Sequence, residues 1–194
     1  MQKNRLEAFS DGVLAIIITI MVLELKVPRG ADWDTLWPLF PVFLSYVLSF
    51  AYVGIYWNNH HHLFQATPHV SAGILWTNLN LLFWLSLFPF SAAWMGQNHF
   101  STIPTVLYGA VLLLAAMSYT AMQYAIIHHQ GPGSMLAAAL GSDWKGKLSI
   151  LVYVAAIPLA FVNPAIAQAM YVLVALVWIV PDRRIEDILK SRSD

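Results

Sequence analysis

A single carboxylate stands near the start of the first long apolar segment of the sequence. Asp11 precedes a mostly apolar run that extends from Val13 to Leu23. A charged group inside a bilayer costs on the order of 3 kcal/mol unless it is paired or hydrated. Asp11 therefore predicts either a buried hydrogen-bonded strut between helices or a direct contact for a permeating cation. The candidate partners are Arg5, His60, Asn78, Asn80 and the indole N–H groups of Trp57, Trp76 and Trp84.

The same segment carries a narrow apolar line. At about 100° per residue, Ile16, Ile20 and Leu23 fall on one line of a helix, Thr19 lies beside it, and Asp11 points well away. Such a line most often faces lipid or a protein core, and a pore-lining role is the alternative. The Thr19 hydroxyl either bonds to the backbone carbonyl four residues earlier or softens the dehydration of a passing cation.

Three consecutive histidines, His60, His61 and His62, end the second apolar segment and raise the question of a metal site. Consecutive helical residues point about 100° apart, so three neighbours cannot all face one ion. The His-x-x-x-His spacing of zinc sites and paired carboxylates are both absent nearby. We therefore predict no metal site. The cluster is interpreted as a polar membrane boundary or as a proton sensor, because histidine titrates between pH 5 and 8.

The composition defines the class of protein that must position these residues. Of 194 residues, 59% are hydrophobic and only 10% are charged, which is typical of a membrane protein. The net charge is zero, so no basic surface for nucleic acid is predicted. The chain has no cysteine and none of the common phosphate-binding, serine-hydrolase or metalloprotease motifs. We predict no enzyme, no catalytic residue and no cofactor.

The apolar segments predict an all-α, polytopic membrane protein with six transmembrane helices. A spanning helix needs roughly 20 mostly apolar residues, so six helices use nearly the whole chain. The first segment is interpreted as a retained helix and not a signal peptide, because it carries Asp11 and has no small-residue cleavage site. Residues 1–181 form one domain, and residues 182–194 a short tail, in which Ile185, Ile188 and Leu189 share a helical face. The six helices are expected at about 4–27, 36–62, 71–95, 102–128, 146–162 and 165–180, and Pro89 is expected to kink the third or to end its regular part.

The distribution of lysine and arginine predicts the orientation in the membrane. With six spans, both termini and the loops after helices two and four lie on one side. Cytoplasmic loops are enriched in Lys and Arg, so both termini are predicted to be cytoplasmic. The opposite side has only Lys26 and Arg29. The residues on the predicted cytoplasmic side are Lys3, Arg5, Lys145, Lys147, Arg183, Arg184, Lys190 and Arg192.

The start of the first helix resembles a family signature. Arg5 is followed four residues later by Phe9-Ser10-Asp11. This pattern, in a six-span chain of about this length, is similar to that of the endolysosomal potassium channel family known as transmembrane protein 175 and its prokaryotic homologues. The stretches at residues 56–62 and 75–79 also resemble that family. The resemblance covers most of the chain.

The resemblance implies a homotetramer whose central pore is lined by four copies of helix one. It implies a hydrophobic constriction at Ile16, Ile20 and Leu23, which are the residues of the apolar line. Thr19 takes the place that matters for cation preference in the family. The remaining motif residues are implied to form a packing network: Arg5, Phe9, Ser10 and Asp11, with Trp57, His60 and Asn78 as partners.

The functional prediction is a potassium-conducting cation channel in a prokaryotic plasma membrane, with K⁺ as the permeating ion and the lipid bilayer and monovalent cations as its partners. No carbonyl-lined filter of the Thr-Val-Gly-Tyr-Gly kind is present, so selectivity for potassium over sodium should be weak. The main alternative is a proton-permeable or proton-coupled transporter that uses Asp11 and the membrane-boundary histidines. A membrane scaffold without transport is a third class.

Overall fold

The computed structural model describes residues 2–131, 133–140 and 143–179. Every regular element in these three ranges is a helix. Two short 3₁₀ turns, η1 (Trp33–Thr35) and η2 (Trp37–Leu39), precede the second long helix. The α-helices are α1 (Lys3–Leu23), α2 (Phe40–Gln65), α3 (Ala72–Ser86), α4 (Phe88–Gln97), α5 (Thr102–Gln130), α6 (Met135–Leu140), α7 (Trp144–Val162) and α8 (Pro164–Ile179).

Length and apolar composition identify the helices that can cross a bilayer. Five stretches of the described chain qualify: α1, Trp33–Gln65, Ala72–Gln97, α5 and α7. Helix α8 is a shorter apolar helix of 16 described residues. These six stretches correspond to the six predicted spans, and the predicted all-α, multi-pass architecture is confirmed.

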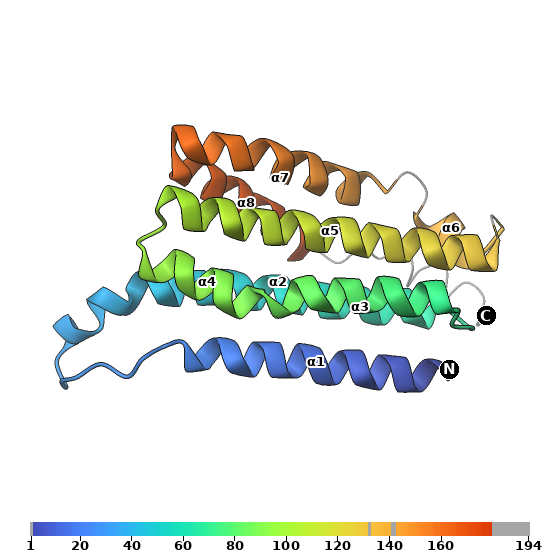
Figure 1. Cartoon of the computed structure of the whole chain (residues 1–194), viewed down its shortest axis with the longest axis horizontal. Helices are drawn as coiled ribbons and strands as arrows, with labels where there is room; N and C mark the ends of the chain where they lie inside the picture. Colours follow the sequence, from blue (N-terminus) through green and yellow to red (C-terminus); the bar gives the residue numbers. More distant parts are fainter. Residues whose placement is uncertain (1, 132, 141–142, 180–194) are drawn as a thin grey trace.

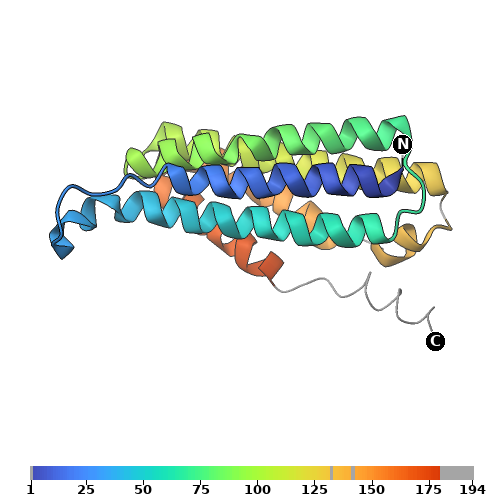
Figure 2. The same ribbon diagram turned by 90° about the horizontal axis from the view of Figure 1, so that it is seen from below.

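Helix α1 lies at the edge of the bundle. It runs alongside α2 and the α3–α4 pair, while α5 separates this group from α7 (Figure 1). Figure 2 shows α1 in front of the other helices, between α2 on one side and the α3–α4 pair on the other. The N-terminal end of α1, the α2–α3 connection and α6 lie together at one end of the bundle, which we call the amino end (Figures 1 and 2).

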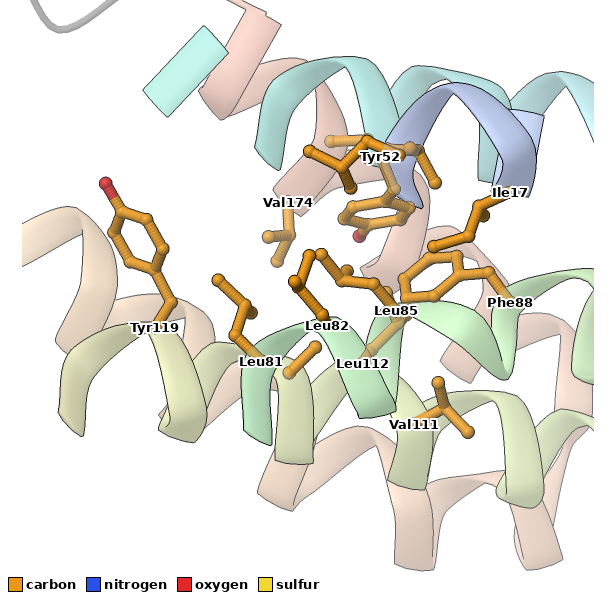
Figure 3. Close-up of a cluster of buried hydrophobic side chains, with 14 of the residues drawn as sticks. Ile17, Tyr52, Leu81, Leu82, Leu85, Phe88, Val111, Leu112, Tyr119 and Val174 are labelled. Atoms are coloured by element: carbon orange, nitrogen blue, oxygen red, sulfur yellow. The ribbon is translucent and has the colours of Figure 1, made fainter. Parts of the chain in front are cut away.

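One apolar core joins the helices. Leucines of α3 meet a phenylalanine of α4 and a tyrosine of α2, and α1 contributes Ile17 from its covered side (Figure 3). Inside a bilayer, tight packing of this kind holds helices together, because lipid tails are as apolar as the side chains. The fully or almost fully buried residues at this centre include Tyr52, Leu81, Leu82, Leu85, Phe88 and Leu112.

The third predicted span is divided. The sequence predicted a span over 71–95 that is kinked at Pro89 or ends its regular part there, and in the structure α3 ends at Ser86 and α4 begins at Phe88. Proline has no N–H to donate and its ring clashes with the carbonyl four residues earlier, so it kinks or breaks a helix, and here the helix is broken. Pro89 instead occupies the first turn of α4, where its missing N–H costs nothing.

Other boundaries also differ from the expected ones. Helix α1 ends at Leu23 and not at residue 27, and α2 begins at Phe40 after the two 3₁₀ turns. The connection expected at 129–145 contains the short helix α6. The residues predicted to form an amphipathic tail, and the end of the expected helix 165–180, lie partly or wholly outside the described residues.

Candidate functional site

Helix α1 has one buried face and one exposed face. Its buried residues recur every three or four positions and pack against α2, α3 and α4. This spacing keeps them on a single side of the helix, so the opposite side remains open in the single subunit. The buried residues are Leu6, Ser10, Leu14, Ile17 and Met21.

The exposed face carries the predicted apolar line. Ile16 is 59% exposed, Ile20 44% and Leu23 74%, which is unusual for large apolar side chains unless lipid, a partner or a pore surrounds them. Arg5 and Phe9 are also exposed and continue the same line towards the amino end, at intervals of three or four residues through Gly12. The line therefore runs along the whole helix.

Thr19 lies beside this line and is exposed. Its hydroxyl donates a hydrogen bond to the Ala15 carbonyl at 2.7 Å. A hydroxyl has one donor and two acceptor lone pairs, so this bond leaves acceptor capacity on the oxygen. The Thr19 hydroxyl can therefore keep its bond to the Ala15 carbonyl and still contact a cation weakly. The two alternatives that the sequence left open are compatible with each other.

A buried polar network anchors the covered face of α1 to α2 and α3. Asn78 Nδ2 of α3 donates to Ser10 Oγ at 3.0 Å, and Ser10 Oγ donates to the Leu6 carbonyl at 2.9 Å. The His60 Nε2 of α2 lies 2.8 Å from Asn78 Oδ1. A carbonyl oxygen can only accept, so His60 carries a proton on Nε2. All three side chains are buried, and each donor has an acceptor.

Asp11 lies outside this buried network. Its Oδ1 accepts a hydrogen bond from Trp57 Nε1 at 3.1 Å, in an exposed position between α1 and α2. The Trp57 ring in turn stacks on the His61 ring, with centroids 6.4 Å apart. Two separate sets of hydrogen bonds, which we call ties, thus hold α1 to its neighbours. One is the buried network and the other is the exposed bond between Asp11 and Trp57.

The four residues of the sequence motif do not all lie in these two contacts. Ser10 and Asp11 take part in the two ties, with Asn78, His60 and Trp57 as partners, which are the residues named from the sequence. Arg5 and Phe9 are on the exposed face of α1 instead, away from the buried network. Asn80, another candidate partner of Asp11, donates to Ser118 Oγ of α5 at 2.6 Å.

The three histidine side chains of the cluster do not point towards one common site. His60 points into the buried network, whereas His61 and His62 each contact the side chain of Gln65, at 2.9 and 3.3 Å. Within the described residues, no group of three metal-ligating side chains is close enough to hold an ion. Gln65 was not singled out from the sequence, although its spacing from His61, four residues on a helix, would have placed the two side chains together.

These features define a multi-pass helical membrane protein whose first helix presents one open apolar face. The sequence profile of the family described as "Endosomal/lysosomal potassium channel TMEM175" matches residues 5–89, which contain most of α1 and all of α2 and α3. A potassium channel of Chryseobacterium sp. (strain P1-3) is 55% identical over 191 residues, covering 98% of this chain and all of that protein. A potassium channel of Streptomyces collinus is 30% identical over 188 residues, covering 91% of each chain. The chain therefore belongs to the TMEM175 family, a family of ion channels and not of enzymes.

The fold is also found in a solved channel structure. The crystal structure of a lysosomal potassium-selective channel TMEM175 homolog from Chamaesiphon minutus superposes with a TM-score of 0.81, covering 93% of this chain and 97% of that one. The two sequences are 24% identical, so this match bears on the fold alone. The resemblance inferred from the motif at the start of helix one is thus confirmed at the level of family and fold.

Proposed function

We propose that this chain is a potassium-conducting channel, assembled as a homotetramer in which four copies of α1 line a central pore. The observation that carries the proposal is the open face of α1, where three large apolar side chains are exposed while the opposite face is buried and hydrogen-bonded. A helix held this way presents a fixed line of side chains to whatever lies beyond it. Membership in the family and the naming of the Chryseobacterium and Streptomyces relatives as potassium channels support a pore there.

The gate follows from the chemistry of that line. Rings of Ile16, Ile20 and Leu23 offer no ligand to an ion, and a narrow ring of this kind repels water and closes the path by dewetting. A modest outward movement of α1 widens and wets the constriction. The Thr19 oxygen then lowers the cost of partial ion dehydration, which gives only weak preference for potassium over sodium.

The motif residues take complementary roles in this proposal. Ser10 with Asn78 and His60 fixes the rotation of α1 about its axis, and Asp11 with Trp57 fixes its amino-terminal part. Arg5 and Phe9 lie on the open face, where they meet neighbouring subunits or the pore mouth.

The membrane arrangement completes the proposal. Residues 1–181 form the channel domain in a prokaryotic plasma membrane, and both termini, with the tail 182–194, are cytoplasmic. The permeant species is K⁺, alongside other monovalent cations, and no cofactor is involved. The starts of α1 and α7, which carry Lys3, Arg5, Lys145 and Lys147, point towards the amino end of the bundle, and the end of α1, after which Lys26 and Arg29 follow, lies at the other end, in keeping with this orientation.

The direct test is the reversal potential of the purified protein in a planar bilayer with high potassium and low sodium on one side and the reverse on the other. A current that reverses between zero and the potassium equilibrium potential is expected, because a filter without carbonyl ligands discriminates weakly. Intact oligomers that pass no uncoupled current would contradict the proposal. A reversal at the proton equilibrium potential under an added pH gradient would favour the proton-permeable alternative.

Replacing Asp11 by Asn separates a channel from a proton-coupled transporter. The amide keeps an oxygen that accepts the Trp57 N–H, and a neutral hydrogen bond is roughly half as strong as a charge-assisted one, so the tie weakens without being lost. We expect the current to stay within about threefold of the wild type, equivalent to at most about 0.7 kcal/mol of altered gating. Potassium flux into liposomes checks this. Abolished flux in correctly assembled Asp11→Asn protein would indicate a proton relay instead.

A further inference from the structure

The outer loop, residues 24–39, connects α1 to α2 at the end of the bundle opposite the amino end. It extends beyond the neighbouring ends of α4, α5 and α7 in both views (Figures 1 and 2). Its two 3₁₀ turns pack on each other, and η2 also packs on the start of α2, but no other helix of the described chain packs closely on them. The loop is therefore structured, and its own subunit leaves most of it uncovered.

Large apolar side chains of the outer loop are exposed. Val27 is 90% exposed and Trp33 82%, and Trp37 is exposed as well. The Trp37 ring meets the Phe40 ring edge to face, with centroids 5.9 Å apart, and the rest of its surface is open. Contiguous exposed apolar side chains mark interaction sites, and tryptophan is enriched at the centres of protein interfaces. The loop is therefore a docking surface.

The outer loop also carries charges of both signs. Lys26 and Arg29 come first along the loop, and Asp32 and Asp34 follow them. All four side chains are exposed, whereas Glu24 at the start of the loop is half-buried. None of the four forms an ion pair with another described residue. A surface with separate basic and acidic parts is complementary to a second copy of itself that meets it head to tail, as subunits of a ring do.

The position of the outer loop selects its occupant. The loop leaves α1 directly after Leu23. In the proposed pore, the four copies of α1 surround the axis at roughly the 8–10 Å spacing of packed helices, so the four loops begin side by side at the pore rim. Surrounding lipid is on the far side of the subunit, beyond α7, which α5 separates from α1 (Figure 1). The nearest uncovered surface is therefore the outer loop of the next subunit.

We propose that each outer loop packs on the outer loop of the next subunit, so that four loops form a collar around the outer mouth of the pore. Trp33 and Trp37 of one copy cover Val27 of the next. Arg29 of one copy pairs with Asp34 of its neighbour. The collar rests on the homotetramer with an α1-lined pore of the proposed function, and it holds the outer ends of the four α1 helices together.

The first test is cross-linking, which the absence of native cysteine makes direct. Two differently tagged full-length chains are co-expressed, one with Arg29→Cys and one with Asp34→Cys, and treated with a short bismaleimide in the membrane. A covalent dimer that carries both tags is expected. Arg29→Cys paired with Lys147→Cys, at the amino end, should give none. Tetramers that conduct potassium but give no Arg29–Asp34 product would overturn the collar alone, whereas monomers without current would overturn the proposed function as well.

The second test measures what the tryptophans contribute to assembly. Trp33→Ala/Trp37→Ala should raise the concentration at which half of the oligomer dissociates in detergent by at least about tenfold, since buried tryptophans dominate interfaces. Phe161→Ala removes an exposed ring near the outer end of α7 and should leave this concentration unchanged. Equal effects of the two variants would overturn the collar. Quenching by brominated lipid of the fluorescence that the tryptophan variant loses would assign the loop to the membrane surface and also overturn it.

Discussion

Ile16→Asn is expected to enlarge the basal potassium current by at least about tenfold. In the proposed pore, four isoleucines form a ring that excludes water, and four amides would allow water to enter. Burying an exposed isoleucine side chain away from water contributes roughly 1.5–3 kcal/mol. About 1.4 kcal/mol is enough to shift a closed–open equilibrium tenfold. Steady current per channel in planar bilayers, measured beside the wild type, checks this.

Val22→Asn is the matched control for this prediction. Val22 is on the same helix and is 44% exposed, but six residues at about 100° each place it about 120° from Ile16 around the axis. It should leave the basal current close to that of the wild type. Equal currents from Ile16→Asn and the wild type would remove the hydrophobic gate from the proposal. Equal enlargement by both variants would show that polarity anywhere on α1 loosens the assembly.

Composition and hydropathy were sufficient to predict the all-α, multi-pass fold, because a bilayer allows few other solutions. They placed α5 and α7 within about two residues of their ends. They could not decide whether Pro89 kinks the third span or divides it, because a proline after a long apolar run is compatible with either, and they did not show how closely α4 packs against α2. There, Gly96 of α4 approaches Val42 so closely that an added Cβ would lie 2.6 Å from the Val42 Cα.

The candidate site was only partly predictable. The helical period separated Ser10 from the line of Ile16, and the structure places these two residues on opposite faces. Periodicity alone did not determine which polar residue of α3 would meet Ser10, since Asn78 and Asn80 are two residues apart and point in different directions; the family resemblance named Asn78. What surrounds the exposed face of α1 depends on other subunits and on lipid, so a single chain does not define it.

Asn78→Ala is expected to destabilise the subunit by about 2 kcal/mol. The substitution removes the acceptor of the His60 N–H and the donor to Ser10 at once, and a buried donor left without an acceptor costs roughly 1–3 kcal/mol. Polar contacts between membrane helices usually contribute less, about 0.6 kcal/mol on average, because the unfolded chain in the membrane finds other partners. The expected loss for Asn78→Ala is above that average because the side chains of Ser10, His60 and Asn78 are all buried. Reversible unfolding in mixed micelles, followed by tryptophan fluorescence, measures the change.

Asn80→Ala provides the control on the same helix. Asn80 makes one partly exposed hydrogen bond to Ser118, whose hydroxyl still donates to the Leu114 carbonyl after the substitution. Its loss should cost less than about 1 kcal/mol, since no buried group is left unpaired. Equal destabilisation by the two variants would mean that the His60–Asn78–Ser10 network is not a special anchor.

A double-mutant cycle of Ser10→Ala with Asn78→Ala then isolates the direct link between α1 and α3. If the 3.0 Å contact between these side chains carries the anchoring, the two losses should fall short of additivity by about 0.5 kcal/mol or more, the size expected for residues in one network. Basal current measured on the same variants connects stability to gating. A looser α1 should raise the current without any change at Ile16, because the rotation of the helix determines which side chains meet at the constriction. Fully additive losses with an unchanged current would separate the anchor from the gate.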